Sequence, residues 1–406
     1  MPSASERTIV LITGARQTGK TTSARRCYSG LRYVNLDSIE YRMQLSDVSS
    51  FAWGRSVGPA VLDEVQKLPG IFDKVKFAYD ERAIDFSVLL GSAQILLLKN
   101  VRETLAGRIV VKELWPLMLS ELAAGNKAGA IAPPLVARMF ESGSVSRACE
   151  KEPEVVVGAA AAAHADAEAH LLTWGGMPAL LPLSEQRRKE WLRSYELTYL
   201  ERDLADLARL HDLMPFRRFQ QFAAARSGQL LAYSQLARDA GIGVETARRY
   251  LEYLRISYQA FLLQPYGRNL TSTLVKTPKL YWADIGLLKQ LAGEAGVGLG
   301  ALFETYVVSE IVKYVRTMAL DVRPYFYRTR SGMEVDLLLQ SPKGVMGIEI
   351  KAGEHVAPSD ATRLVDLGSA LKRKWLGGIV VYRGTRVHRI HDTVWAVPSW
   401  RLLAGK

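Results

Sequence analysis

The chain has 406 residues, 48% of them hydrophobic and 23% charged, and its formal net charge is +12. This length exceeds one ordinary hydrophobic core, so we expect two or three domains. The composition is that of a soluble globular protein and excludes a disordered or fibrous one. The longest apolar runs, at 86–98 and 155–163, fall short of the roughly 18 residues that a membrane-spanning helix needs. We therefore expect no membrane partner.

Cysteine usage and the distribution of charge narrow the class of protein further. Cys27 and Cys149 offer neither a disulfide framework nor a metal-ligand spacing, and the N-terminus lacks the basic-then-apolar order of a secretory signal. We expect a cytoplasmic protein. Basic residues outnumber acidic ones by 17 to 12 over 184–300 and by 16 to 10 over 301–406. This excess favours a polyanionic partner such as nucleic acid, and arginine-rich codon usage is the alternative explanation.

The first motif that carries chemistry is a phosphate-binding loop. The stretch TIVLITGARQTGKTT at 8–22 contains an apolar strand, a G-x-x-x-x-G-K-T loop and a helix-forming run. Gly14 and Gly19 allow consecutive backbone N–H groups to point at a phosphate. Lys20 would neutralise the β- and γ-phosphates, and the Thr21 hydroxyl would bind Mg²⁺. ATP and Mg²⁺ are thus the expected cofactors, and the predicted nucleotide-binding residues are Gly14, Ala15, Arg16, Gln17, Thr18, Gly19, Lys20, Thr21 and Thr22.

A second apolar strand, in GPAVLDEVQKLPG at 58–70, ends in two carboxylates. Asp63 would hold Mg²⁺ through water, and Glu64 would orient the attacking water. This pairing favours hydrolysis over transfer to a small acceptor, so a small-molecule kinase is a poor fit. Short apolar strands at 33–37, 86–94 and 105–117, separated by helical segments, predict a parallel α/β sheet.

Four motifs over residues 8–121 together carry a family resemblance. GARQTGKTT, LDEVQKLPG, LLGSAQ and LAGR…ELWPLMLSEL, in this order, resemble the bacterial and archaeal AAA-type ATPases of uncharacterised function. That family usually has a polar Thr before the Gly-Ser of its fourth strand, where a sensor contacts the γ-phosphate. This chain has Leu90 there, and Ser92 is the alternative sensor.

The same resemblance implies an arginine that acts on the nucleotide of a neighbouring subunit, and therefore a homo-oligomer. Arg108, at the start of a predicted strand, is one candidate. Arg202, on a predicted helix within 191–210, is the other, and for it a solvated salt bridge is the alternative reading.

The middle of the chain is predicted to be mainly helical. Residues 123–170 are rich in Ala and Gly with little periodicity, which we interpret as a loop, short helices and a linker without chemistry. His164 and His170 lack the spacing of a metal site. The stretch WGGMPALL at 174–181 resembles the Gly-Gly-x-Pro turn of the same ATPase family.

A helix-turn-helix pattern follows between 230 and 266. A helix over 233–240, a turn containing two glycines and a second helix are predicted, and 260–269 could form a wing. Arg248 and Arg249 on the second helix would suit a DNA backbone or groove. The alternative is a winged helix that serves only packing or oligomerisation.

Charged residues also occur on an apolar hairpin near the C-terminal end. In GMEVDLLLQSPKGVMGIEIKAG, at 332–353, two strands flank a QSPKG turn. Asp336 and Glu349 lie on adjacent strands and could together hold a divalent metal at a phosphodiester. Lys351 shares a face with Glu349 and could polarise the attacking water. Incidental salt bridges on a hairpin are the alternative explanation.

The helix predicted upstream, at 299–315, offers Glu304 as a third acid, with Glu310 as its substitute. The resulting E…D…E-x-K order resembles PD-(D/E)XK nuclease cores and the C-terminal domain that is paired with this ATPase type. The resemblance implies a metal site at Glu304, Asp336 and Glu349, and a catalytic role for Asp336, Glu349 and Lys351. Such domains are also kept as folds that bind DNA or protein without cutting.

The sequence thus predicts an α/β protein with a parallel-sheet P-loop ATPase domain, a winged-helix-like helical region and a restriction-endonuclease-like α/β domain. The predicted boundaries are 1–122 for the ATPase core, 123–183 for the linker and short helices, 184–295 for the helical region and 296–406 for the nuclease-like domain. The predicted function is Mg²⁺-dependent ATP hydrolysis coupled to DNA binding or processing. The alternative is an ATP-controlled switch or adaptor whose C-terminal domain binds without cleaving.

Overall fold

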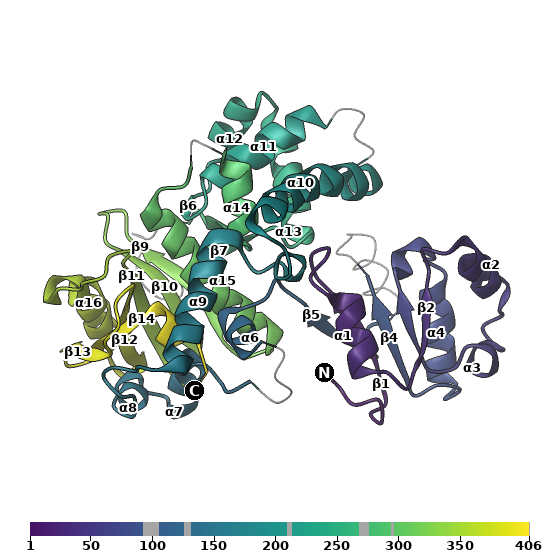
Figure 1. Cartoon of the computed structure of the whole chain (residues 1–406), viewed down its shortest axis with the longest axis horizontal. Helices are drawn as coiled ribbons and strands as arrows, with labels where there is room; N and C mark the ends of the chain where they lie inside the picture. The colour runs from purple at the N-terminus through teal and green to yellow at the C-terminus, as the bar shows by residue number, and fades with distance from the viewer. Residues whose placement is uncertain (92–104, 126–130, 209–212, 268–275, 294–295, 406) are drawn as a thin grey trace. The chain divides into compact units, whose positions relative to one another are not determined.

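The computed structural model describes residues 1–91, 105–125, 131–208, 213–267, 276–293 and 296–405, with the side chains of all of these except 198–208. The chain forms two compact units (Figure 1). Unit 1 comprises Met1–Pro116, Leu197–Asp212 and Glu252–Gln259, and unit 2 comprises Leu117–Glu196, Leu213–Leu251 and Ala260–Lys406. Within the described ranges, every helix is too short or too polar to cross a membrane.

Unit 1 is built on a parallel sheet, which confirms the predicted architecture of the N-terminal region. Across its described residues the sheet has five strands in the order β2-β3-β4-β1-β5, and every neighbouring pair is parallel. Its strands are β1 (Thr8–Thr13), β2 (Arg32–Asn35), β3 (Ala60–Asp63), β4 (Phe86–Leu90) and β5 (Ile109–Glu113). Its helices include α1 (Lys20–Cys27), α2 (Ile39–Asp47), α3 (Trp53–Ser56) and α4 (Ile71–Asp80).

Alternation along β1 explains how both faces of this sheet are covered. Ile9 and Leu11 pack in one apolar cluster with side chains of α3 and α4. Val10 and Ile12 pack in another cluster with Ala24 of α1. Because both faces are buried, the strands have continuous apolar sequences. The carboxyl ends of the parallel strands therefore form one edge, where α/β proteins bind ligands.

Unit 2 contains a larger mixed sheet. Counted over the described residues, it has nine strands in the order β13-β14-β12-β11-β10-β9-β7-β8-β6. The predicted hairpin is confirmed: β10 and β11 are antiparallel, with Leu337 opposite Ile348. The strands are β6 (Gln229–Leu230), β7 (Ala260–Pro265), β8 (Lys279–Trp282), β9 (Arg323–Arg328), β10 (Glu334–Ser341), β11 (Gly344–Ile350), β12 (Trp375–Tyr382), β13 (His388–His391) and β14 (Val394–Pro398).

Among the helices of unit 2, α16 packs its Leu364 and Leu367 onto Val335 and Leu338 of β10. The helices are α6 (Leu119–Ala124), α7 (Leu135–Ser142), α8 (Val145–Cys149), α9 (Ala159–Trp174), α11 (Met214–Ala225), α12 (Tyr233–Ala240), α14 (Ile285–Ala292), α15 (Leu299–Thr317), α16 (Thr362–Leu371) and α17 (Ser399–Leu403). Helices α10 (Glu185–Ala208) and α13 (Val244–Ile256) contribute residues to both units.

The helix-turn-helix pattern corresponds to α12 and α13, and α12 has the bounds predicted from the sequence. On α13, Tyr250 is buried with its ring 5.0 Å from that of Phe216 on α11. The predicted wing begins as β7, which pairs antiparallel with β8. The end of the predicted wing, 268–269, lies outside the described residues.

Helix α9 corrects the prediction for residues 123–170, because it runs for 16 residues where only short helices and a linker were expected. The uninterrupted alanines that hid any amphipathic periodicity are also the best helix formers. Only Ala167 and Leu171 of this helix are buried. The sequence of α9 therefore has little of the apolar periodicity that would indicate a helix.

Candidate functional site

The P-loop joins the carboxyl end of β1 to the start of α1, at the ligand-binding edge of the unit 1 sheet. Gly14 and Gly19 have φ angles of 148° and 91°. A Cβ on Gly14 would lie 2.0 Å from the carbonyl oxygen of Leu114, so the loop requires glycine there. Backbone N–H groups that point out of the first turn of a helix make such a loop a ready anion site.

The lysine of this loop is buried, with 9% of its surface exposed. Lys20 Nζ donates to the carbonyl oxygens of Gly14 at 3.0 Å and Ala15 at 2.6 Å. Ala15 also accepts a hydrogen bond from the Thr18 hydroxyl at 2.9 Å. The ammonium is therefore held inside the curve of the loop, where a phosphate would meet it.

Thr21 and Asp63, predicted to share a metal, do come together from α1 and β3. The Thr21 hydroxyl donates to Oδ2 of Asp63 at 2.6 Å. A hydroxyl and a carboxylate are the hard oxygen donors that Mg²⁺ prefers. These residues fit a Mg²⁺ ion bound with ATP phosphates, and when bound that ion would screen the phosphate charge.

Tyr33, which the sequence did not single out, is a further hydrogen-bond partner of Asp63. Its hydroxyl, on β2, donates to Oδ2 of Asp63 at 2.8 Å. The backbone N–H of Glu64 donates to Oδ1 at 2.9 Å. Burial and the hydrogen bond to Asp63 raise the pKa of Tyr33, so the hydroxyl keeps its proton. Tyr33 thus orients the carboxylate, as hydrogen-bond partners of metal-binding carboxylates do.

Glu64, predicted to orient the attacking water, has a left-handed backbone with φ 54° and ψ 45°. This conformation is uncommon for a residue other than glycine and often marks a functional position. Its carboxylate accepts a hydrogen bond from Nε2 of Gln66. Burial raises the pKa of Glu64 and the charge of Asp63 adds to the rise, while the Gln66 hydrogen bond opposes it. A carboxylate with a raised pKa is a stronger general base.

The predicted departure at Leu90 is evident in the structure. Leu90 ends β4, the strand between β1 and β3, and its side chain is fully buried in the apolar cluster that includes Val88. It presents no polar atom to a nucleotide. Ser92, the alternative sensor, lies outside the described residues.

Of the two candidate arginines, the structure describes the side chain of Arg108 but not that of Arg202. Arg108 precedes β5, at the edge of the sheet opposite the P-loop, and its Nε lies 2.6 Å from Oδ1 of Asp80. The six residues of β1 separate the two edges by about 20 Å, so Arg108 does not reach the P-loop of its own chain. Arg202 belongs to α10, and its side chain lies outside the described set.

The acids predicted in the C-terminal region gather in unit 2, around β8, β10 and α15. Glu304 accepts hydrogen bonds from Lys279 Nζ at 2.9 Å and from the Tyr281 hydroxyl at 2.6 Å. Oδ2 of Asp336 accepts from the backbone N–H of Ile350 at 2.8 Å. Burial and the neighbouring charges of Glu304 and Glu349 raise the pKa of Asp336.

Lys351 lies beside Glu349, as the shared face predicted. Its Nζ is 3.0 Å from Oε1 of Glu349, which also accepts from Nη1 of Arg363 at 3.1 Å. Glu310, the substitute third acid, is used elsewhere: it accepts from the backbone N–H of Leu119 at 2.7 Å and pairs with Lys313.

The predicted metal centre at Glu304, Asp336 and Glu349 does not fit this arrangement. In the described part of the chain, no group of three His, Cys, Asp or Glu side chains is placed to hold a metal ion. Lys279, which the sequence did not single out, pairs with both Glu304 and Glu334 among these acids. A lysine that opens the otherwise apolar strand KLYW was the available signal.

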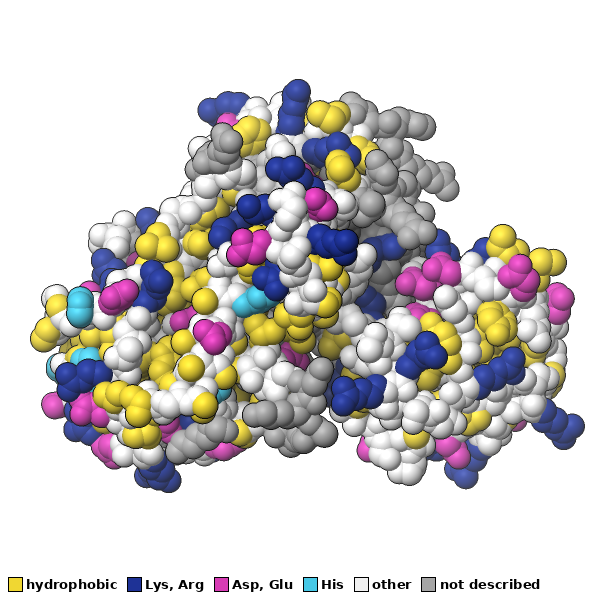
Figure 2. Space-filling view, viewed as in Figure 1, with side chains coloured by type: hydrophobic (Ala, Val, Ile, Leu, Met, Phe, Trp, Pro, Cys, Tyr) yellow, Lys and Arg dark blue, Asp and Glu magenta, His cyan; other side chains and the backbone are white. Residues whose placement is uncertain are grey.

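The arginines predicted for DNA lie on the exposed side of α13. Arg248 is paired with Glu245 at 3.4 Å and covers the ring of Tyr233, with 54% of its side chain exposed. Arg249 is exposed. On the face drawn in Figure 2, Lys and Arg side chains gather over the helical region of unit 2 and acidic ones are sparser there.

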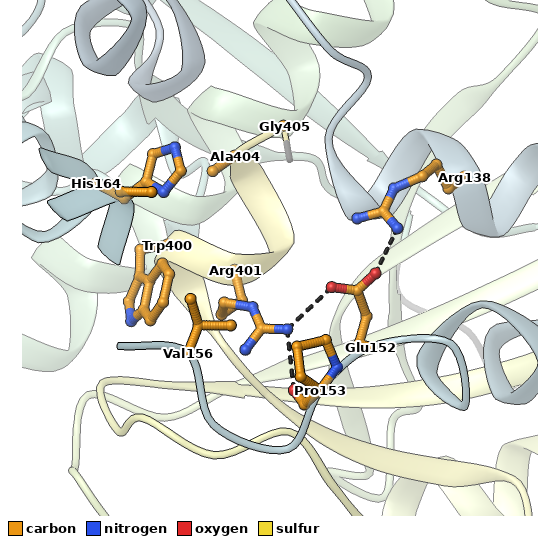
Figure 3. Close-up of a pocket in the computed structure, with 10 residues that line it drawn as sticks. Arg138, Glu152, Pro153, Val156, His164, Trp400, Arg401, Ala404 and Gly405 are labelled. Carbon is orange, nitrogen blue, oxygen red and sulfur yellow. Dashed lines mark hydrogen bonds and ion pairs between the residues drawn. The ribbon is translucent and has the colours of Figure 1, made fainter. Parts of the chain in front are cut away.

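A separate cavity of about 270 Å³ lies in unit 2 (Figure 3). On its wall, Glu152 binds two arginines, Arg138 and Arg401, the latter at 2.9 Å. His164 stacks on Trp400 with ring centroids 6.0 Å apart. These contacts hold α17 to the loop before α9. The charged residues of this cavity therefore stabilise the fold of unit 2.

Three parts of the chain match known family models. Residues 6–123 match an AAA domain, 166–297 match a domain of unknown function (DUF8612), and 299–402 match another (DUF4143). The N-terminal region is therefore a P-loop domain of the AAA type. The C-terminal match does not confirm a nuclease fold.

The chain is also similar to two relatives over most of its length and to two solved structures. Uncharacterized proteins of Mycobacterium bovis and Mycobacterium tuberculosis are each 29% identical over 408 residues, covering 97% of this chain and 81% of the relative. A signal transduction ATPase with a tetratricopeptide repeat sensor, from Pyrococcus horikoshii, gives a TM-score of 0.24 at 10% identity over 77% of this chain and 45% of its own. A Vibrio cholerae protein gives a TM-score of 0.20 at 11% identity, covering 97% of this chain and 95% of its own. Such scores carry no argument about fold or function.

Proposed function

We propose that this protein hydrolyses ATP with Mg²⁺. The observation that supports the proposal best is the meeting of Lys20, Thr21 and Asp63 at the carboxyl edge of the unit 1 sheet. Lys20 and the loop N–H groups would bind the phosphates, and Thr21 and Asp63 would hold the ion. Glu64, in its strained conformation beside Asp63, would take the proton of the attacking water.

The test is ATP turnover by the full chain, with Lys20→Ala and Glu64→Gln as variants. Lys20→Ala should lose nucleotide binding, and Glu64→Gln should retain nucleotide while turnover falls by roughly 10²–10⁴. Binding of a fluorescent ATP analogue separates the two effects. Turnover by Glu64→Gln at the wild-type rate would refute the assignment of Glu64 as the base.

For the rest of the chain we propose DNA as the partner, with hydrolysis coupled to DNA binding. The basic excess after residue 184 and the exposed Arg248 and Arg249 support this proposal. DNA-stimulated turnover is the expected result, and its failure with single- and double-stranded DNA would refute the coupling.

A second candidate is a nucleotide-controlled switch or adaptor, and two observations favour it. Leu90 supplies no polar sensor, and Gln66 holds the carboxylate of Glu64. A switch would retain ATP and hydrolyse it slowly at a rate that DNA does not change. Measuring turnover with and without DNA therefore distinguishes the two functions.

The active form of either would be a homo-oligomer in which Arg108 or Arg202 of one subunit serves the nucleotide of the next. The position of Arg108, remote from the P-loop of its own chain, supports a role in trans over a role in cis. Mixing Arg108→Ala subunits with Lys20→Ala subunits would restore turnover at mixed interfaces if Arg108 is that residue. No restoration in the mixture would leave Arg202 as the candidate.

A further inference from the structure

The acidic cluster of unit 2 contains a buried ammonium group. Lys279, at the start of β8, is 3% exposed. Its Nζ lies 2.9 Å from Oε1 of Glu304 on α15 and pairs with Oε1 of Glu334 on β10. The ammonium group is thus held between carboxylates from two different elements.

The glutamates around it make further ion pairs within the protein. Arg328 lies 2.9 Å from Oε2 of Glu334, and Lys351 and Arg363 share Oε1 of Glu349. Glu304, Glu334 and Glu349 are thus each ion-paired, with cations supplied by Lys279, Arg328, Lys351 and Arg363. Lys351 also lies 3.8 Å from Oδ1 of Asp360, and Asp336 accepts from the backbone N–H of Ile350. A divalent ion bound by these glutamates would have to displace one of the four cations.

One carboxylate oxygen in the cluster favours metal binding. Oε2 of Glu349 is buried and, among the described residues, has no hydrogen-bond partner. A single carboxylate oxygen does not make a site for Mg²⁺ or Mn²⁺, which need several oxygen ligands in a fixed geometry. A metal site would need further acids beside Glu349. Glu304 already accepts hydrogen bonds from Lys279 and Tyr281.

We propose that the ammonium of Lys279 takes the place of a divalent cation in this cluster, so that the C-terminal region works without a metal and does not cleave phosphodiesters by metal-dependent hydrolysis. The ammonium joins β8 to α15 and β10, which makes the cluster a charged connection between the helix-turn-helix region and the C-terminal strands. This inference is independent of the proposed ATPase, because every residue in it belongs to unit 2.

The test is Mn²⁺ binding to the full chain without nucleotide, measured as the decrease in the electron paramagnetic resonance signal of free Mn²⁺. The variants are Lys279→Met, which keeps length but removes charge, and Lys289→Met, an exposed lysine on α14, as the matched control. Wild type and Lys289→Met should bind no Mn²⁺ at the cluster. Lys279→Met should gain a site that the added change Asp336→Asn weakens by about tenfold or more.

Two results would overturn the proposal. One is Mn²⁺ binding by the wild type that Asp336→Asn weakens about tenfold. The other is a folded Lys279→Met protein that binds no more Mn²⁺ than the wild type. If Lys279→Met does not fold, as circular dichroism would show, the comparison of wild type with Asp336→Asn still decides whether the native cluster binds metal.

Discussion

Tyr33 illustrates how one hydroxyl can set the geometry of a site that the sequence locates only in part. It donates to the same oxygen of Asp63 that accepts from Thr21. We predict that Tyr33→Phe raises the Mg²⁺ concentration for half-maximal turnover by about tenfold, as loss of an outer-shell hydrogen bond does at other metal sites. Mg²⁺ titration of the ATPase rate measures the effect, and binding of ATP without Mg²⁺ should stay as in the wild type.

The control for this prediction is Tyr41→Phe, which removes an exposed hydroxyl from α2. An equal rise in the Mg²⁺ requirement for both variants would show that the effect does not come from Asp63.

Glu64 and Gln66 predict a dependence on pH. A general base works when ionised, and burial raises the pKa of Glu64, so turnover should fall at a higher pH than the ordinary glutamate pKa allows. The Gln66 hydrogen bond lowers that pKa. Gln66→Ala should therefore move the acidic limb of the pH–rate profile to higher pH, measured as kcat from steady-state assays.

Lys67→Ala, at the exposed residue next to Gln66, is the matched control and should leave the acidic limb in place. A limb that stays fixed in Gln66→Ala, or shifts to lower pH, would argue that another group governs the profile.

At the scale of elements, close backbone approaches fix the turn that precedes α10. A Cβ on Gly286 of α14 would lie 1.9 Å from the carbonyl oxygen of Trp174, and one on Gly176 would lie 2.2 Å from that of Leu117. Backbone atoms cannot move aside as a flexible side chain can. Gly286→Ala should therefore destabilise unit 2 by about 1–3 kcal/mol or more, seen as a lower Tm.

Gly300→Ala serves as the matched substitution on α15, where a Cβ would meet no atom within 4 Å. Because alanine is the better helix former, this variant should be as stable as the wild type or more stable by up to about 1 kcal/mol. Similar losses of Tm in both variants would contradict the steric explanation for Gly286.

The same element scale separates what the sequence could predict from what it could not. The P-loop, the helix-turn-helix and the β10–β11 hairpin depend on spacing within short stretches, and each was found where predicted. The lysine in the apolar strand KLYW marks Lys279 as unusual, but its partners Glu304 and Glu334 are distant along the chain, so no local pattern could indicate the ion pairs. Tyr33 and Asp63 meet for the same reason, through the β2–β3 pairing.

At the scale of the whole molecule, the proposed coupling needs nucleotide chemistry in unit 1 to respond to a partner bound at unit 2. The chain passes between the units within α10 and α13, and α13 also bears Arg248 and Arg249. If α13 binds DNA through its first part, as proposed, its last part in unit 1 would transmit a change in either direction. Coupling should therefore be sensitive to charge on α13.

Arg249→Glu tests this coupling because Arg249 is exposed on α13. A phosphate contact adds about one to the slope of log K against log salt, so the variant should bind duplex DNA more weakly at every sequence, with that slope reduced by about 1. DNA stimulation of turnover should fall with it, and the rate without DNA reports on folding. Arg373→Glu, an equal charge change on an exposed residue after α16, is the control. Equal losses in both variants would mean that general charge, and not α13, attracts DNA.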